Sequence, residues 1–140
     1  MKTSKSLFVI GAMAFWFASV SFTQAAGAAE LEARTSEAAG VRVEVTPRPA
    51  DSSATVWEFE VVMDTHTKPL DTDLAQAAVL TDDGGARYEP VSWQGDPPGG
   101  HHRKGTLQFP LPAGKPKAVE LTLKDIGGVN ERVFRWELDE

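Results

Sequence analysis

The sequence predicts an all-β fold in which short antiparallel strands pack as two sheets. Apolar and polar residues alternate along several short segments, which is the period-two pattern of strands with one buried face. Turn-forming residues separate these segments, and no amphipathic helix longer than about two turns interrupts them. We count seven such segments in about 100 residues, which matches the strand number of an immunoglobulin-like β-sandwich.

The N-terminal segment has the features of an export signal. Lys2 and Lys5 precede an apolar run from Leu7 to Phe22, and small residues follow as far as Ala28. This pattern predicts a signal peptide over residues 1–28, because a spanning helix needs roughly 20 apolar residues. An uncleaved N-terminal anchor is the alternative. We expect a periplasmic or secreted protein with no membrane span after signal cleavage.

Charge and cysteine content restrict the classes of partner and site. Loss of Lys2 and Lys5 with the signal changes the formal charge from −6 to −8. This acidity argues against nucleic acid and anionic membranes as partners, since both are bound through neutralisation of phosphates. The chain has no cysteine, which excludes disulfides, thiolate metal sites and a cysteine nucleophile. Stability must therefore come from the hydrophobic core.

The segment after the signal gives little structural signal. Residues 29–40 are small or charged, and Leu31 is their one sizeable apolar residue. We expect these residues to form a flexible N-terminal tail or a frayed helical turn. The immunoglobulin-like domain is expected over residues 41–140, where the alternation begins.

The seven expected strands follow in order from Val41. Residues 55–63 give the clearest pattern, and their large apolar side chains place this strand at the centre of a sheet. The strands and their inward residues are 41–46 with Val41, Val43 and Val45; 55–63 with Trp57, Phe59, Val61 and Met63; 77–80, a short apolar run; 87–93; 106–109 with Leu107 and Phe109; 117–124 with Val119, Leu121 and Leu123; and 131–138 with Phe134, Trp136 and Leu138.

The region between residues 71 and 93 contains the turn and capping signals. Asp71 or Asp73 is expected to cap a short helix or 3₁₀ turn at Leu74. The run at 77–80 ends in an Asp-Asp-Gly-Gly sequence that favours a hairpin. Residues 87–93 are then the return strand, and Pro90 makes part of it a sheet edge or a bulge.

The chemically most capable stretch is residues 97–105, which carries two adjacent histidines and two cations. In an antiparallel sandwich, successive loops alternate between the two ends of the domain. Residues 64–74, 94–105 and 125–130 therefore share one end. All three histidines of the chain lie in the first two of these loops.

These histidines are candidate metal ligands. His66, His101 and His102, with Asp64 as a further ligand or an orienting carboxylate, form a sulfur-free donor set of the kind that copper, zinc or nickel accepts. The alternative is that the histidines only brace the two loops. A metal site requires a free ring nitrogen on each histidine, whereas bracing commits the ring nitrogens to backbone or carboxylate partners.

The same stretch suggests a second binding mode. Arg103 and Lys104, beside glycine-rich backbone, are candidates for binding an anion or a partner. The alternative is that Arg103 pairs with aspartates of the neighbouring loops. Trp57 and Trp136 are expected in the core, whereas Trp93 is a candidate for lining a ligand pocket.

No motif of a known catalytic class is visible. The sequence has no G-x-S-x-G elbow, no H-E-x-x-H pair and no phosphate-binding loop. The protein is therefore not expected to be an enzyme.

Four segments carry a family resemblance: Trp57–Val61, Asp64–His66, Pro97–Arg103 and Gly127–Trp136. They resemble segments of small, exported, uncharacterised bacterial proteins with a predicted immunoglobulin-like domain, over roughly residues 41–138. No activity is established for that group, so the resemblance implies fold and export without assigning site residues. The chain is similar only in outline to periplasmic copper-carrier sandwiches, whose N-terminal histidine ligand it lacks.

The sequence thus predicts an exported, non-catalytic binding domain. The first hypothesis is that it binds a divalent transition metal, copper or zinc, through the histidines of two loops. The alternative is a structural or protein-interaction module of the cell envelope, in which those histidines only brace the loops.

Overall fold

The computed structural model describes residues 31–138, so the predicted signal peptide at residues 1–28 lies outside the described residues. Nine strands and one short helix are present in residues 31–138. They are β1 (Arg34–Ala38), β2 (Val41–Pro47), β3 (Val56–Thr65), α1 (Leu74–Ala77), β4 (Ala78–Asp82), β5 (Arg87–Tyr88), β6 (Ser92–Gly95), β7 (His102–Pro110), β8 (Ala118–Ile126) and β9 (Val129–Glu137).

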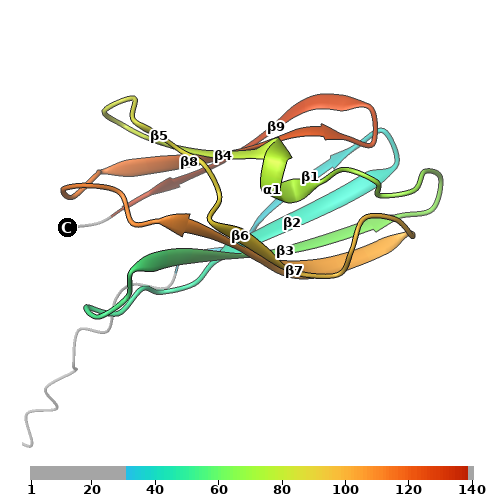
Figure 1. The fold of residues 1–140 in the computed structure, drawn as a ribbon. Coiled ribbons are helices and arrows are strands. Elements are labelled where there is room, and N and C mark those ends of the chain that lie inside the picture. Colours follow the sequence, from blue (N-terminus) through green and yellow to red (C-terminus); the bar gives the residue numbers. More distant parts are fainter. Residues whose placement is uncertain (1–30, 139–140) are drawn as a thin grey trace, which may run out of the picture.

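The strands form two antiparallel sheets that pack as a β-sandwich (Figure 1). One sheet has the order β1-β2-β3-β7-β6, and the other has the order β5-β4-β8-β9. The all-β prediction is therefore confirmed. In the part of the chain that the structure describes, no helix is long and apolar enough to cross a bilayer.

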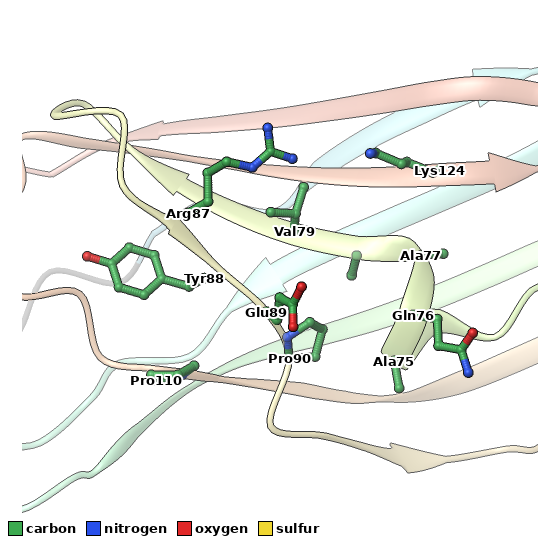
Figure 2. Close-up of a pocket in the computed structure, with 11 residues that line it drawn as sticks. Ala75, Gln76, Ala77, Val79, Arg87, Tyr88, Glu89, Pro90, Pro110 and Lys124 are labelled. Atoms are coloured by element: carbon green, nitrogen blue, oxygen red, sulfur yellow. The ribbon is translucent and has the colours of Figure 1, made fainter.

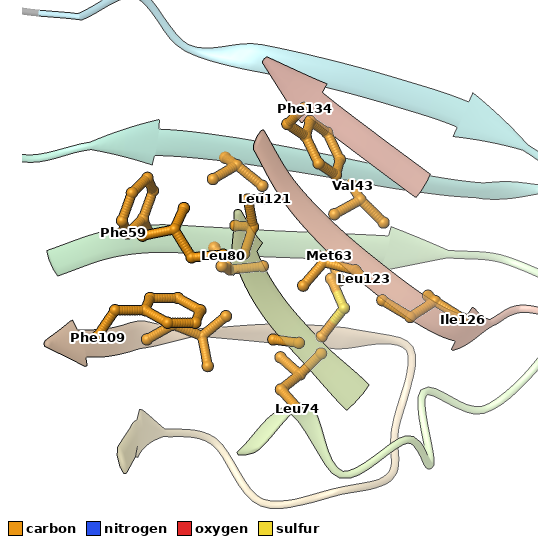
Figure 3. Close-up of a cluster of buried hydrophobic side chains, with 14 of the residues drawn as sticks. Val43, Phe59, Met63, Leu74, Leu80, Phe109, Leu121, Leu123, Ile126 and Phe134 are labelled. Atoms are coloured by element: carbon orange, nitrogen blue, oxygen red, sulfur yellow. The ribbon is translucent and has the colours of Figure 1, made fainter. Parts of the chain in front are cut away.

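The core lies between the sheets and is built from the alternating faces that the sequence predicts. Phe59 of β3 is at its aromatic centre, with ring centroids 4.9 Å from Trp57, 5.7 Å from Trp136 and 5.6 Å from Phe109, the last edge-on. Both tryptophans are buried, as predicted. Figure 3 shows the cluster, in which aromatic and aliphatic side chains from both sheets meet around Leu80.

Part of the expected N-terminal tail is instead a strand. Residues 34–38 form β1, which pairs with β2 from Arg34↔Val45 to Ala38↔Val41. Ala39 and Gly40 connect the two strands with φ values of 52° and 75°, as a tight primed hairpin turn requires. The prediction of a tail was wrong because β1 has no buried face. Only Ser36 is half-buried, so the sequence of β1 does not show the alternation of apolar and polar residues that indicates a strand.

Side chains from β9 hold β1 in place. Trp136 Nε1 donates to the Glu32 carbonyl at 2.7 Å. The Arg132 guanidinium donates at 3.0–3.3 Å to the carbonyl oxygens of Ser36, Ala38, Val41 and Ile126. Arg132 is 2% exposed, so these bonds lie in the interior between the edges of the two sheets. Contacts across roughly 95 residues of sequence therefore order this segment.

The single strand expected at residues 87–93 is two short strands in different sheets. Arg87 and Tyr88 pair with β4, whereas residues 92–95 pair with β7 of the other sheet. Pro90 lies in the crossover between them, where its missing N–H breaks no ladder. This split, together with β1, raises the strand count from the predicted seven to nine in the described residues.

Two further boundaries bear on the candidate site. Asp73 caps α1, and its Oδ1 accepts a hydrogen bond from the Ala75 N–H at 3.0 Å, in agreement with the capping prediction. β7 begins at His102 rather than at the expected Thr106. His102, Arg103 and Lys104 are thus strand residues, so their side chains alternate between the two faces of the sheet.

Candidate functional site

Three connections meet at one end of the sandwich, as the strand polarity predicted. The β3–α1 connection bonds to the β6–β7 connection through Leu70 N–H to Gly100 O and Gly99 N–H to Leu70 O, both at 2.9 Å. Thr72 Oγ1 donates to the carbonyl of Asp125, next to the β8–β9 turn, at 2.6 Å. We call these three connections the histidine end. Two main-chain bonds and one side-chain bond thus join the three connections.

Arg103 is the central bracing side chain of the histidine end. It is 1% exposed, and its Nη1 donates to the carbonyls of Leu70 at 2.9 Å and Thr72 at 2.7 Å. Its Nη2 donates to the Asp96 carbonyl at 3.4 Å. Burial lowers the pKa of Arg103, and the negative charges of nearby aspartates act in the opposite direction. The guanidinium is therefore inside the domain, where an incoming anion or partner does not reach it.

The two other candidates for anion or partner binding also have partners within the domain. Lys104 Nζ lies 3.3 Å from Glu60 Oε1, and this hydrogen bond is the main reason why the pKa of Glu60 is below its usual value. Trp93 Nε1 donates to the Asp96 carbonyl at 2.8 Å, and its ring lies 5.6 Å from the Arg103 guanidinium carbon. Trp93 covers Gly105 so closely that a Cβ there would lie 2.6 Å from the ring. Its role is therefore packing rather than pocket lining.

The three histidines have different surroundings. His102 lies opposite Asp64 in the β3–β7 ladder, with Nδ1 2.5 Å from Asp64 Oδ1. The carbonyl of exposed His101 accepts the Thr65 N–H. His66 lines a shallow depression of about 480 Å³ that also includes Asp64 and Glu37. Within residues 31–138, no three His, Cys, Asp or Glu side chains are grouped so that they could hold a metal ion.

We predict that His102→Ala lowers the free energy of unfolding by at most about 1 kcal/mol, because its pair with Asp64 is solvent-exposed. Urea denaturation of the two proteins measures the difference. A zinc or copper titration of both proteins is the accompanying control. Metal binding by the parent that disappears in the variant would contradict the bracing role of His102.

Sequence reasoning missed a second region, which lies where the chain changes sheets. A groove of about 800 Å³ runs between α1 and the start of β4 on one side and residues 87–90 on the other. Pro110 and Lys124 complete it (Figure 2). We call it the crossover groove. The signals for it in the sequence are the three alanines at positions 75, 77 and 78 and the strand-breaking Pro90, and neither indicates a groove by itself.

The crossover groove is open for two local reasons. Ala75, Ala77 and Ala78 have no side chain beyond Cβ to fill it. In addition, β5 pairs with β4 only at Leu80 and Thr81, after which the chain leaves for the other sheet. On this side, the first residues of β4 therefore have no strand partner among the described residues.

Tyr88 fixes one wall of the groove. Its hydroxyl donates to Asp82 Oδ2 at 3.0 Å and accepts from the Ala113 N–H at 3.3 Å. Burial raises the pKa of Tyr88, and the hydrogen bond to Asp82 acts in the same direction. The phenol stays protonated and anchors the crossover to β4 on one side and to the β7–β8 connection on the other.

The charged side chains of the groove have no ion-pair partner. Arg87, Glu89 and Lys124 all line the groove, and none of them is within 4.0 Å of an opposite charge in the part of the chain that the structure describes. Arg135, on the same sheet, lies 2.8 Å from Glu137 and 3.7 Å from Glu120. The groove thus combines an unfilled volume with polar groups that are free to contact a ligand.

Comparison of the chain with protein-family models, curated proteins and solved structures finds no match. The function is therefore inferred from the geometry of the two regions described above.

Proposed function

We propose that the protein is an exported, non-catalytic binding domain that takes up an extended segment of a partner protein in the crossover groove. The observation that carries this proposal is the groove itself, whose volume of about 800 Å³ is within the range of ligand-binding clefts. Its three alanines leave room for a main chain, and its charged side chains without an ion-pair partner line it as well. The signal-like N-terminal sequence supports export.

A polypeptide suits this site because a strand edge borders it. β4 has no partner on the groove side before Leu80. Extended peptides commonly bind by adding a strand to such an edge, with side-chain pockets providing selectivity. A bound segment therefore runs alongside β4 at Ala78 and Val79, where the Ala78 N–H already donates to the Leu74 carbonyl at the end of α1.

An immunoglobulin-like arrangement is part of the proposal. With β2 to β9 labelled A, B, C, C′, D, E, F and G, the observed sheets become ABED and C′CFG, with β1 added beside strand A. This order supports the interpretation, because constant-type immunoglobulin domains place ABED and CFG in their two sheets. The crossover groove then lies beside strand C at the C′–D connection, where the chain changes sheets.

In this proposal the histidine end is a scaffold. The contact of His102 with Asp64 and the carbonyl bonds of buried Arg103 support bracing of the loops. His102 has the carboxylate partner that the bracing alternative requires of a histidine. A bound metal has no role in this proposal.

We expect Val79→Trp to abolish peptide binding in the groove. The bulky ring fills the space beside β4, whereas Val133→Trp on the same sheet leaves the groove open. Val133 is the matched control because Val79, Thr122 and Val133 form one cross-strand row and Val133 is 54% exposed. Amide chemical shifts of the labelled protein, measured with pools of short synthetic peptides of varied charge, report the binding.

The expected shifts are confined to residues 75–79, 87–91 and 124, persist in Val133→Trp and disappear in Val79→Trp. Shifts that cluster at the histidine end instead, or no shifts with any pool, would contradict the proposal.

A further inference from the structure

Two cations converge on the crossover groove from opposite sides of β4. Arg87 extends from β5 and Lys124 from β8, and β4 lies between these two strands. Figure 2 shows the two side chains pointing toward each other across Val79. Like charges placed this way repel each other, and no carboxylate of the described residues pairs with either of them.

Arg135, on the same sheet, provides a comparison because its charge is paired within the protein. Arg87, Thr81, Glu120 and Arg135 form one cross-strand row, so the two arginines occupy equivalent positions at opposite edges of the sheet. Arg135 is paired with both Glu120 and Glu137, whereas Arg87 is paired with neither. Glu131 is opposite Lys124 in the ladder, yet they form no ion pair. The two groove cations are thus free although acidic residues lie on the same sheet.

Glu89 adds a negative charge to the lining of the groove. It lines the groove from the crossover, one residue before Pro90. A ligand therefore meets positive charge over Val79 and a hydrogen-bond acceptor at the crossover. A polypeptide with one acidic side chain satisfies both, since Arg binds its carboxylate through two N–H groups and a neighbouring peptide N–H can donate to Glu89.

We propose that the partner segment bound in the crossover groove is acidic, with one Asp or Glu carboxylate held between Arg87 and Lys124. This inference rests on the proposed peptide-binding function and adds the chemistry of its ligand. The overall charge of the chain is −6, so this pair of cations is a local attractive site on an otherwise acidic protein. Binding through it weakens as salt is added, because both cations are at the surface.

The test compares two synthetic peptides of about six residues that differ only by a central Glu or Gln. We expect the Glu peptide to bind about tenfold more tightly, which corresponds to one charge-assisted hydrogen bond. Arg87→Gln and Lys124→Gln each remove most of this preference, whereas Arg135→Gln retains it. Isothermal titration at low and high salt gives the affinities, and amide shifts locate the peptide.

A charge-reversal variant distinguishes a loss of the cation from a loss of folding, because an unfolded protein would not gain a new peptide preference. Lys124→Glu should reverse the order, so that a peptide with a central Lys binds better than the Glu peptide. Equal binding of the Glu and Gln peptides in the groove would overturn the acidic-ligand inference and leave the peptide-binding function standing. Absence of binding by either peptide overturns the inference. The amide-shift measurement with peptide pools then decides whether the crossover groove binds peptides.

Discussion

Arg103→Ala should lower the free energy of unfolding by about 3–5 kcal/mol and loosen the histidine end. The substitution leaves the carbonyls of Leu70, Thr72 and Asp96 without their common donor. It also removes the group that stacks on Trp93. Urea denaturation measures the loss of stability, and hydrogen exchange of the Leu70 and Gly99 amides reports the loops directly.

Arg103→Lys serves as the charge-conserving comparison. An ammonium group donates from one nitrogen and cannot reproduce the planar fork whose two nitrogens reach carbonyls of the β3–α1 and β6–β7 connections, so this variant should recover only part of the stability. A loss below about 1 kcal/mol in Arg103→Ala, with the loop amides still protected, would show that main-chain bonds alone hold the histidine end.

Arg132→Ala should be similarly destabilising, by about 3–5 kcal/mol, and should free β1. Arg132 is buried and burial lowers its pKa, so its charge is retained through hydrogen bonds to four carbonyl groups rather than through a carboxylate in the described residues. Without it, those carbonyls are left near the interior with no donor. Hydrogen exchange should show β1 amides losing protection while amides of β3 and β7 keep theirs.

Arg135→Ala is the matched control for Arg132, since both residues are on β9 and Arg135 is exposed to solvent. Its ion pairs contribute at most about 1 kcal/mol at the surface, so the variant should remain close to the parent. If Arg132→Ala and Arg135→Ala had the same effect on β1, the proposed anchoring of that strand would be wrong.

Most of the core was predictable because burial repeats along the strands. Phe59, Leu121 and Phe134 each belong to a segment in which every second residue faces inward, and the period alone reveals the buried face. The same rule fails for β1, which has no inward apolar face to show. It also fails for residues 87–95, where the chain changes sheets in the middle of an otherwise strand-like run.

The candidate sites divide in a similar way. Strand polarity was sufficient to bring the histidine-bearing loops to one end, since antiparallel connections must alternate. Strand polarity did not reveal that Arg103 faces inward. This depends on β7 starting at His102, because side chains of a strand then point alternately to the two faces of the sheet. The crossover groove had no local signature, since its walls come from segments around residues 75, 88, 110 and 124.

Residue patterns in the chain alone determined the all-β class, the inward faces of the main strands, a helix cap at Asp71 or Asp73, and the meeting of the long loops. These features depend on periodicity or on neighbouring residues, which a sequence displays directly. The tertiary structure decided the rest: the anchoring of β1 by Arg132, the pairing of His102 with Asp64, and the groove between β4 and the crossover. Each of these joins residues that are distant in the chain, and their contacts exist only once the two sheets have packed together.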